Sequence, residues 1–112
     1  MVGYESWSVV VVPFPFTDRK FAKRRPALVL STEAFQKAHG HVVLAMITSA
    51  KQSDWPTDVP ILDLETSGLP TASVVRFKLF TLDQRFILSR VGTLAQSDHS
   101  RVFTQLRHVL QL

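Results

Sequence analysis

Residues 9–16 read Val-Val-Val-Val-Pro-Phe-Pro-Phe, and this density of β-branched and aromatic side chains predicts a strand. The segment does not alternate between apolar and polar residues, so we expect both faces of the strand to be covered. Pro13 and Pro15 are two positions apart, so the N–H groups that they lack would face the same side. This part of the strand is therefore expected at a sheet edge, or where the chain leaves the ladder.

Further strands are predicted on the C-terminal side of this segment, separated by Gly, Pro and polar turn signals. They are residues 26–30, 41–47, 58–62, 73–80 and 86–91. Residues 33–38 suit a short helical turn capped by Ser31 or Thr32, and Gly40 follows it as a turn. The tail from Gln96 to Leu112 has apolar residues at helical spacing, with Ser97 as its cap.

Most connections between these strands are too short for helical crossovers, which predicts an antiparallel sheet. The expected fold class is mainly β (α+β), with a small, strongly bent antiparallel sheet or half-barrel and a C-terminal helix. A length of 112 residues suits a single domain, residues 1–112.

Composition narrows the possible classes of protein. The absence of cysteine excludes disulfides and thiolate metal sites. The longest apolar run, residues 9–16, is far short of the roughly 20 residues of a membrane helix, and no basic residue precedes it as in a signal peptide. We therefore expect a cytoplasmic protein without a membrane partner. The net charge is +4, and five of the seven residues from Arg19 to Arg25 are basic.

Strand geometry predicts where a functional site lies. The predicted second strand begins just after Arg25 and the third ends just before Thr48, so antiparallel pairing places both residues at one end of the sheet. The loop of residues 17–23 enters at the same end. Pro26 restricts the backbone of Arg25, whose guanidinium suits a phosphate, and Thr48 adds a short, stiff hydroxyl donor.

Other residues extend this site into a candidate surface for single-stranded nucleic acid. Lys20, Lys23 and Arg24 supply positive potential, and Arg76 and Lys78 form a basic track on the strand face opposite Val75, Phe77 and Leu79. Phe16, Phe21 or Trp55 can stack on bases. The alternative interpretation, on these features alone, is a solvated basic loop followed by an ordinary Arg-Pro pair.

No metal site or alternative catalytic motif emerges from the sequence. His39 and His41 flank a turn at a spacing compatible with chelation, but no third ligand lies near them in the sequence. There is no nucleophile elbow, no suggestive carboxylate pair and no glycine-rich phosphate loop. We expect neither a metal nor a cofactor.

Several segments, in order, resemble the MazF/PemK family of toxins. Residues 10–18 (VVVPFPFTD) and 23–31 (KRRPALVLS) resemble its first two strands, and 46–49 (MITS) its third-strand ending. Residues 58–61 (DVPI), 68–69 (GL), 73–76 (SVVR) and 79–83 (LFTLD) follow in the expected order, and Gly92 precedes the last helix. The resemblance covers nearly the whole chain.

This resemblance implies an SH3-like barrel of the MazF/CcdB type, and a homodimeric, metal-independent endoribonuclease that cuts single-stranded RNA. It also implies a cognate antitoxin whose extended tail fills the RNA groove. The catalytic arginine and threonine of the family fall on Arg25 and Thr48. The gating loop falls on residues 17–23, which brings Thr17 and Asp18 to the RNA, and Ser49 adjoins Thr48.

The sequence departs from the family at four places. Trp7-Ser8 replaces a frequent Gly-Asp pair, and the first loop has no glycine. Phe77 and Lys78 replace RNA-contacting acidic and glutamine residues, so base preference does not carry over. Ala95 stands where a Ser or Asp often caps the last helix.

The implied reaction is attack of the RNA 2′-hydroxyl on the adjacent phosphorus, which leaves a 2′,3′-cyclic phosphate and a 5′-hydroxyl. An arginine is a poor base, because the pKa of a guanidinium lies far above neutral pH. We therefore expect Arg25 to stabilise the pentacovalent phosphate, with proton transfer through substrate or water. Two alternatives stay open, namely a CcdB-like gyrase inhibitor without RNase activity and a non-catalytic RNA-binding relative.

Overall fold

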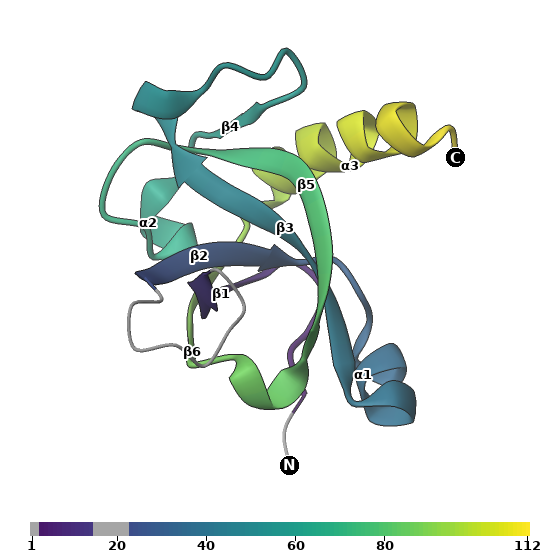
Figure 1. Ribbon diagram of the computed structural model, residues 1–112. Coiled ribbons are helices and arrows are strands. Elements are labelled where there is room, and N and C mark those ends of the chain that lie inside the picture. Colours follow the sequence, from purple (N-terminus) through teal and green to yellow (C-terminus); the bar gives the residue numbers. More distant parts are fainter. Residues whose placement is uncertain (1–2, 15–22) are drawn as a thin grey trace.

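The computed structural model of the protein describes residues 3–14 and 23–112. Within these residues it contains six strands, three α-helices and two short 3-10 helices, η1 and η2 (Figure 1). In chain order they are β1 Ser8–Phe14, β2 Lys23–Val29, α1 Glu33–His39, β3 His41–Ser49, η1 Ala50–Gln52, β4 Val59–Ile61, α2 Leu64–Ser67, β5 Ser73–Asp83, η2 Gln84–Phe86, β6 Ser89–Thr93 and α3 Gln96–Leu110.

All six strands belong to one antiparallel sheet in the order β4-β5-β3-β2-β1-β6. The sheet is strongly curled, with β5 bending through most of its length, and α3 extends away from it towards the C-terminus (Figure 1). The expected fold class, a bent antiparallel sheet with a C-terminal helix, is confirmed.

The sheet carries a hydrophobic cluster on each face. Val9 and Leu28 belong to the cluster that includes Val102 of α3, whereas Val10 and Val12 belong to the cluster on the opposite face. Val9, Val10 and Val12 are fully buried. The non-alternating sequence of β1 is explained by this two-sided burial, as predicted.

Two prolines lie where a neighbouring strand has already ended. Pro13 follows the last β1–β6 pair, Val11 with Ser89, and Pro26 precedes the first β2–β3 pair, Ala27 with Met46. Neither proline therefore removes a ladder hydrogen bond. The predicted departure of β1 from the ladder near Pro13 is confirmed on the side of β6.

The strands that carry the predicted site are longer than expected. β2 begins at Lys23 and β3 ends at Ser49, so Arg25 and Thr48 lie inside strands rather than beside them. The reason is continued pairing, because Arg25 pairs with Val12 and Thr48 pairs with Val74. Both backbones are thereby held by a neighbouring strand.

Three other boundaries differ from the prediction. β5 continues past Phe80 to Asp83 because β3 pairs with it as far as His41. Residues 84–86 form η2, whose first N–H groups are capped by the Asp83 carboxylate, so β6 starts at Ser89 instead of Phe86. β4 is confined to residues 59–61 and lies at the sheet edge, where its proline is tolerated.

The predicted cap of α1 is confirmed, whereas the predicted cap of α3 is wrong. Thr32 caps α1 by accepting from the Phe35 N–H at 3.2 Å, as expected. The prediction that Ser97 caps the last helix is wrong, since Ala95 is the N-cap residue and Ser97 lies in the first turn. Helix α2 was not predicted, because four residues show no periodicity; Asp63 caps it and Gly68 ends it.

Candidate nucleic-acid interface

A cavity of about 180 Å³ opens on one face of the sheet, where β2, β3 and β5 meet η1. It is lined by Phe14, Arg25, Met46, Ile47, Thr48, Gln52, Arg76 and Lys78. These residues come from β1, β2, β3, η1 and β5, and their side chains combine two aromatic or thioether groups with three cations. Arg25 and Thr48, which strand geometry predicted to lie at one end of the sheet, both line it.

The strand register brings Arg25 and Thr48 together. Ala27 pairs with Met46 across β2 and β3, so Arg25 and Thr48, each two positions further out, share the same face and end. Both side chains are half-buried. The Thr48 hydroxyl donates to Gln52 Oε1 at 3.5 Å, the outer limit of a hydrogen bond, so a better acceptor would displace it easily.

Arg76 is occupied by protein ligands. Its Nε donates to Asp58 Oδ1 at 3.2 Å, and its Nη2 lies 2.9 Å from both Asp58 Oδ2 and Asp54 Oδ1. The same nitrogen donates to the Gln52 carbonyl at 3.0 Å, and the Trp55 ring covers the guanidinium at 4.8 Å. Arg76 therefore ties the segment of residues 52–58 to β5.

Burial is the largest influence on the Asp58 carboxylate and raises its pKa, but hydrogen bonds oppose it. Donation from Arg76, from the Ser53 hydroxyl and from the Trp55 N–H together hold the pKa of Asp58 below its ordinary value of 3.8. The hydrogen bond to Asp58 in turn raises the pKa of Arg76. Both groups are charged at neutral pH, and two carboxylates offset the charge of this arginine.

Lys78 and the β5 bulge complete the cavity wall. Ala45 pairs with Leu79 while Met46 pairs with Arg76, so β5 has two extra residues here, and bulges of this kind redirect side chains. Alternation survives the bulge, because Val75 and Phe77 are buried whereas Lys78 is exposed and lines the cavity. The Lys78 Nζ lies 5.4 Å from the centroid of the Phe14 ring.

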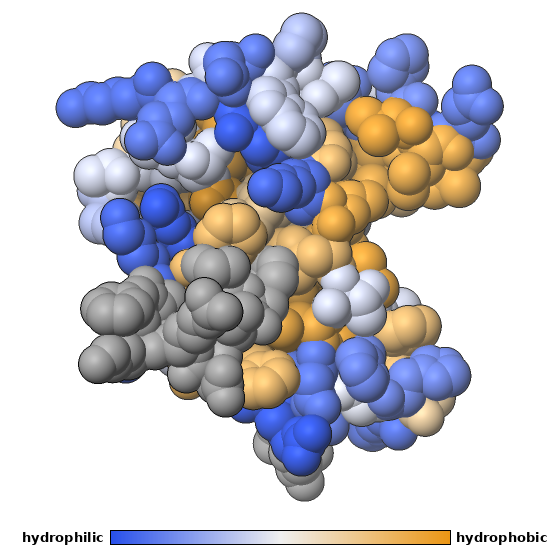
Figure 2. Space-filling model, in the orientation of Figure 1, coloured by the Kyte–Doolittle hydropathy of each residue, from blue (hydrophilic) through white to orange (hydrophobic). Residues whose placement is uncertain are grey.

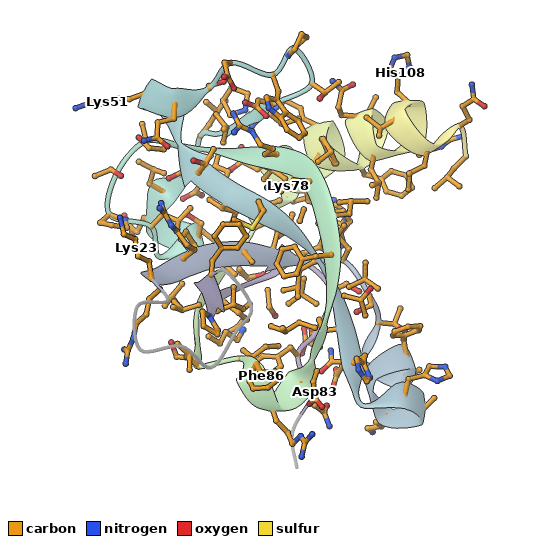
Figure 3. All side chains as sticks on the ribbon, viewed as in Figure 1. Lys23, Lys51, Lys78, Asp83, Phe86 and His108 are labelled. Atoms are coloured by element: carbon orange, nitrogen blue, oxygen red, sulfur yellow. The ribbon has the colours of Figure 1, made fainter. Side chains whose placement is uncertain are left out.

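The other predicted RNA contacts are not all near the cavity. Lys23 and Arg24 are exposed at the start of β2. Figure 3 shows the Lys23 side chain pointing outwards from this first part of the strand. The Ser49 hydroxyl accepts from the Lys51 N–H and caps η1. The Trp55 ring contacts the Arg76 guanidinium, and the residue stays exposed. Five predicted residues lie outside the described part of the chain: Phe16, Thr17, Asp18, Lys20 and Phe21.

Sequence reasoning missed Gln52, Asp58 and Met46. Gln52 is one of several polar residues in a loop without a motif, and Asp58 was taken only as the start of a strand. Among residues 3–14 and 23–112, no group of three or more His, Asp or Glu side chains could hold a metal ion. In the same ranges, no helix is long and apolar enough to span a bilayer.

The family profile described as PemK-like, MazF-like toxin of type II toxin-antitoxin system matches residues 5–110. No curated protein sequence matches the chain. Residues 5–110 include every element that forms the cavity, so the match extends across the candidate site.

Solved structures with the same fold span the whole chain. MazF from Deinococcus radiodurans superposes with a TM-score of 0.78 at 22% identity, covering 100% of both chains. Toxin MazF-mt6 of Mycobacterium tuberculosis has a TM-score of 0.74 at 23% identity, covering 94% of this chain and 97% of its own. An endoribonuclease in complex with its cognate antitoxin, from a mycobacterial species, has a TM-score of 0.77 at 19% identity, covering 100% and 97%.

Proposed function

Because the chain belongs to the PemK-like, MazF-like toxins of type II toxin-antitoxin systems, we propose that it is an endoribonuclease that cuts single-stranded RNA. The observation that carries this proposal is the cavity shared by Arg25 and Thr48. A permanent planar cation and a stiff hydroxyl, both on strand backbones, suit a phosphodiester that must be held in one geometry.

The proposed step is an internal transesterification. The 2′-oxygen attacks phosphorus, the bond from phosphorus to the 5′-oxygen breaks, and the products are a 2′,3′-cyclic phosphate and a free 5′-hydroxyl. The 2′-hydroxyl loses a proton and the leaving oxygen gains one, so no outside reagent is consumed. DNA lacks the nucleophile, which makes the activity specific for RNA.

Arg25 and Thr48 act on the negative charge that develops on the phosphate oxygens. Arg25 donates to both non-bridging oxygens at once, and the weakly held Thr48 hydroxyl turns from Gln52 to one of them. Donors preorganised for the transition state usually supply the largest part of such catalysis. Pairing with Val12 and Val74 keeps both residues in place without substrate.

Proton transfer in this proposal runs through water or a substrate oxygen. None of the eight described residues that line the cavity is a His, Asp or Glu. The nearby carboxylates, Asp54 and Asp58, form ion pairs with Arg76.

Flanking phosphates would contact Lys23, Arg24 and Lys78, with Thr17, Asp18, Lys20 and Ser49 as further contacts carried over from the family. The cognate antitoxin would compete for this groove with an extended tail. A second copy of the chain is proposed to cover exposed apolar residues of α3, such as Phe103 and Leu110. Figure 2 shows hydrophobic side chains gathered over α3 and in the hollow beside it.

The test is cleavage of labelled single-stranded RNA in EDTA by the wild-type chain, by Thr48→Ala and by Thr81→Ala. Thr81 is an exposed strand threonine of β5 that does not line the cavity, which makes it a matched control. We expect Thr48→Ala to cut at least about 100-fold more slowly, as for loss of one transition-state donor. Thr81→Ala should match wild type, and the products should carry cyclic phosphate ends.

Two results would contradict the proposal in different ways. If wild type neither binds nor cuts RNA even at high enzyme concentration, the nuclease interpretation is wrong and the CcdB-like alternative is tested next by gyrase inhibition. If the wild-type chain binds RNA tightly without cutting it, the protein is a non-catalytic RNA-binding relative.

A further inference from the structure

Gln52 combines a backbone held by Arg76 with an exposed, weakly held side chain in the candidate site. Its carbonyl accepts from Arg76 Nη2 at 3.0 Å, and it closes η1 directly after β3. Its side chain is exposed, lines the cavity and reaches within 3.5 Å of the Thr48 hydroxyl. A polar group in this position would contact a nucleotide bound next to a phosphate at Thr48.

We propose that Gln52 reads the base beside the scissile phosphate, with adenine as its preferred partner. The inference rests on the proposed nuclease function and deepens it to a specificity-determining residue. A carboxamide offers one donor and one acceptor side by side, the pattern that pairs with adenine N6 and N7. Bases in single-stranded RNA expose these edges, so a side chain can reach them without opening a duplex.

Other cavity residues are less suited to reading a base. Arg25 and Lys78 carry full charges and are attracted to any phosphate, whatever the sequence. Phe14 and Met46 are apolar and accommodate every base alike. Among the described lining residues, Gln52 alone carries a neutral side chain with both a donor and an acceptor that can lie in one plane with a base.

Arg76 is the positioning residue for Gln52. It lies on β5, the strand next to β3, and grips segment 52–58 through Asp54, Asp58 and the Gln52 carbonyl. Its side chain is only 17% exposed, and the Asp58 side chain only 2%. Without these hydrogen bonds, the end of η1 would be held less firmly relative to Thr48. The Gln52 side chain would then no longer meet the bound base in one fixed position.

The experiment measures cut-site preferences on a randomised single-stranded RNA pool in EDTA, with sequencing of the new ends and single-turnover rates on matched oligonucleotides. Gln52→Leu removes the carboxamide donor and acceptor while keeping a similar volume. Gln96→Leu, on the exposed first turn of α3, is the matched control. Arg76→Ala is compared with Arg85→Ala, whose arginine pairs with Asp83 on the surface away from the cavity. Asp58→Asn serves as a milder variant if Arg76→Ala does not fold.

We expect wild type to prefer adenine about tenfold at one position flanking the cut, the discrimination of a bidentate base contact. Gln52→Leu should abolish the preference at that position alone, while cutting continues. Arg76→Ala or Asp58→Asn should relax the same position, and the two controls should reproduce the wild-type profile. A general loss of folding would lower rates without changing one position selectively.

Several results would overturn the inference. A wild-type profile without adenine preference beside the cut would do so, as would an unchanged profile or a uniformly slower one in Gln52→Leu. Relaxation by Gln52→Leu but not by Arg76→Ala or Asp58→Asn would remove the positioning role of Arg76. If wild type cuts no RNA at all, the proposed function fails, and this inference fails with it.

Discussion

Asp98 is the only acidic or basic residue among the described residues whose whole surface is buried. It lies in the first turn of α3, and its two carboxylate oxygens accept from the backbone N–H groups of Leu62 and Asp63 at 2.9 and 3.0 Å. Arg101, one turn later, pairs with the same carboxylate and also donates to the Pro60 carbonyl at 2.8 Å. Asp98 thus fastens α3 to the chain that follows β4.

Replacing Asp98 with Ala leaves two part-buried backbone donors without an acceptor. Each such donor costs about 1–2 kcal/mol, and the loss of the half-exposed Arg101 partner adds less than about 1 kcal/mol. We therefore expect a loss of about 3 kcal/mol from a total stability of roughly 6–17 kcal/mol for a chain of this length. With an unfolding entropy of about 0.24 kcal/mol/K, Tm should fall by about 13 °C.

Thermal unfolding followed by circular dichroism, with urea unfolding as a second measurement, checks this value. Asp98→Asn keeps one acceptor oxygen and should lose less than Asp98→Ala. Arg85→Ala is the control, because the Arg85 side chain is 81% exposed and its ion pair with Asp83 is screened by water. If Asp98→Ala unfolds within about 3 °C of wild type, the two N–H groups find other acceptors and the reasoning is refuted.

Three further predictions follow from the same structure. Gly40 and Gly68 share a left-handed backbone (φ 67° and 73°), but a Cβ at Gly68 would lie 2.1 Å from the Val91 carbonyl, whereas Gly40 faces open space. In urea unfolding, Gly40→Ala should lose about 1 kcal/mol and Gly68→Ala clearly more; equal losses would contradict the clash. Since the folded-state pKa of Asp58 is lowered, its contribution to stability is present above pH 3.8 and lost as pH falls through the lower folded value. NMR titration should show this midpoint rising in Arg76→Ala, and an unmoved midpoint would count against the ion pair. Arg25→Lys should retain measurable single-turnover cleavage that Arg25→Ala loses, because the positive charge remains; equally complete losses would argue against charge stabilisation, unless two-point donation is essential.

Much of the fold was predictable because strand residues carry their pattern locally. Four consecutive valines predicted a strand buried on both faces, and the alternation of Val75, Arg76, Phe77 and Lys78 predicted which side chains of β5 share a face. The antiparallel arrangement followed from short connections. Strand ends were predicted less well, because a strand ends where its neighbour stops pairing and not where its own composition changes.

The candidate site, too, was predicted only in part. Arg25 and Thr48 were placed together from sequence because both adjoin strands that pair in an antiparallel hairpin arrangement. The role of Arg76 was not foreseen: its partner Asp58 is 18 positions away, and no local pattern links them. The contact between the Trp55 ring and the Arg76 guanidinium was not foreseen either.

By its sequence alone this chain determined its fold class, its family resemblance and the pair at the centre of the proposed site, because these depend on residue type, spacing and strand direction. Only the tertiary structure decided which charges remain free for a ligand and which are used within the protein. Arg76 and Lys78 look alike in sequence, two positions apart on one strand face. Arg76 forms ion pairs with Asp54 and Asp58, which lie in a segment distant in the sequence. Lys78 lines the cavity. The pairing of β4 with β5, which sets Val59 opposite Val75, brings Asp58 to Arg76. Such ion pairs depend on which strands become neighbours, and for that reason the local sequence does not reveal them.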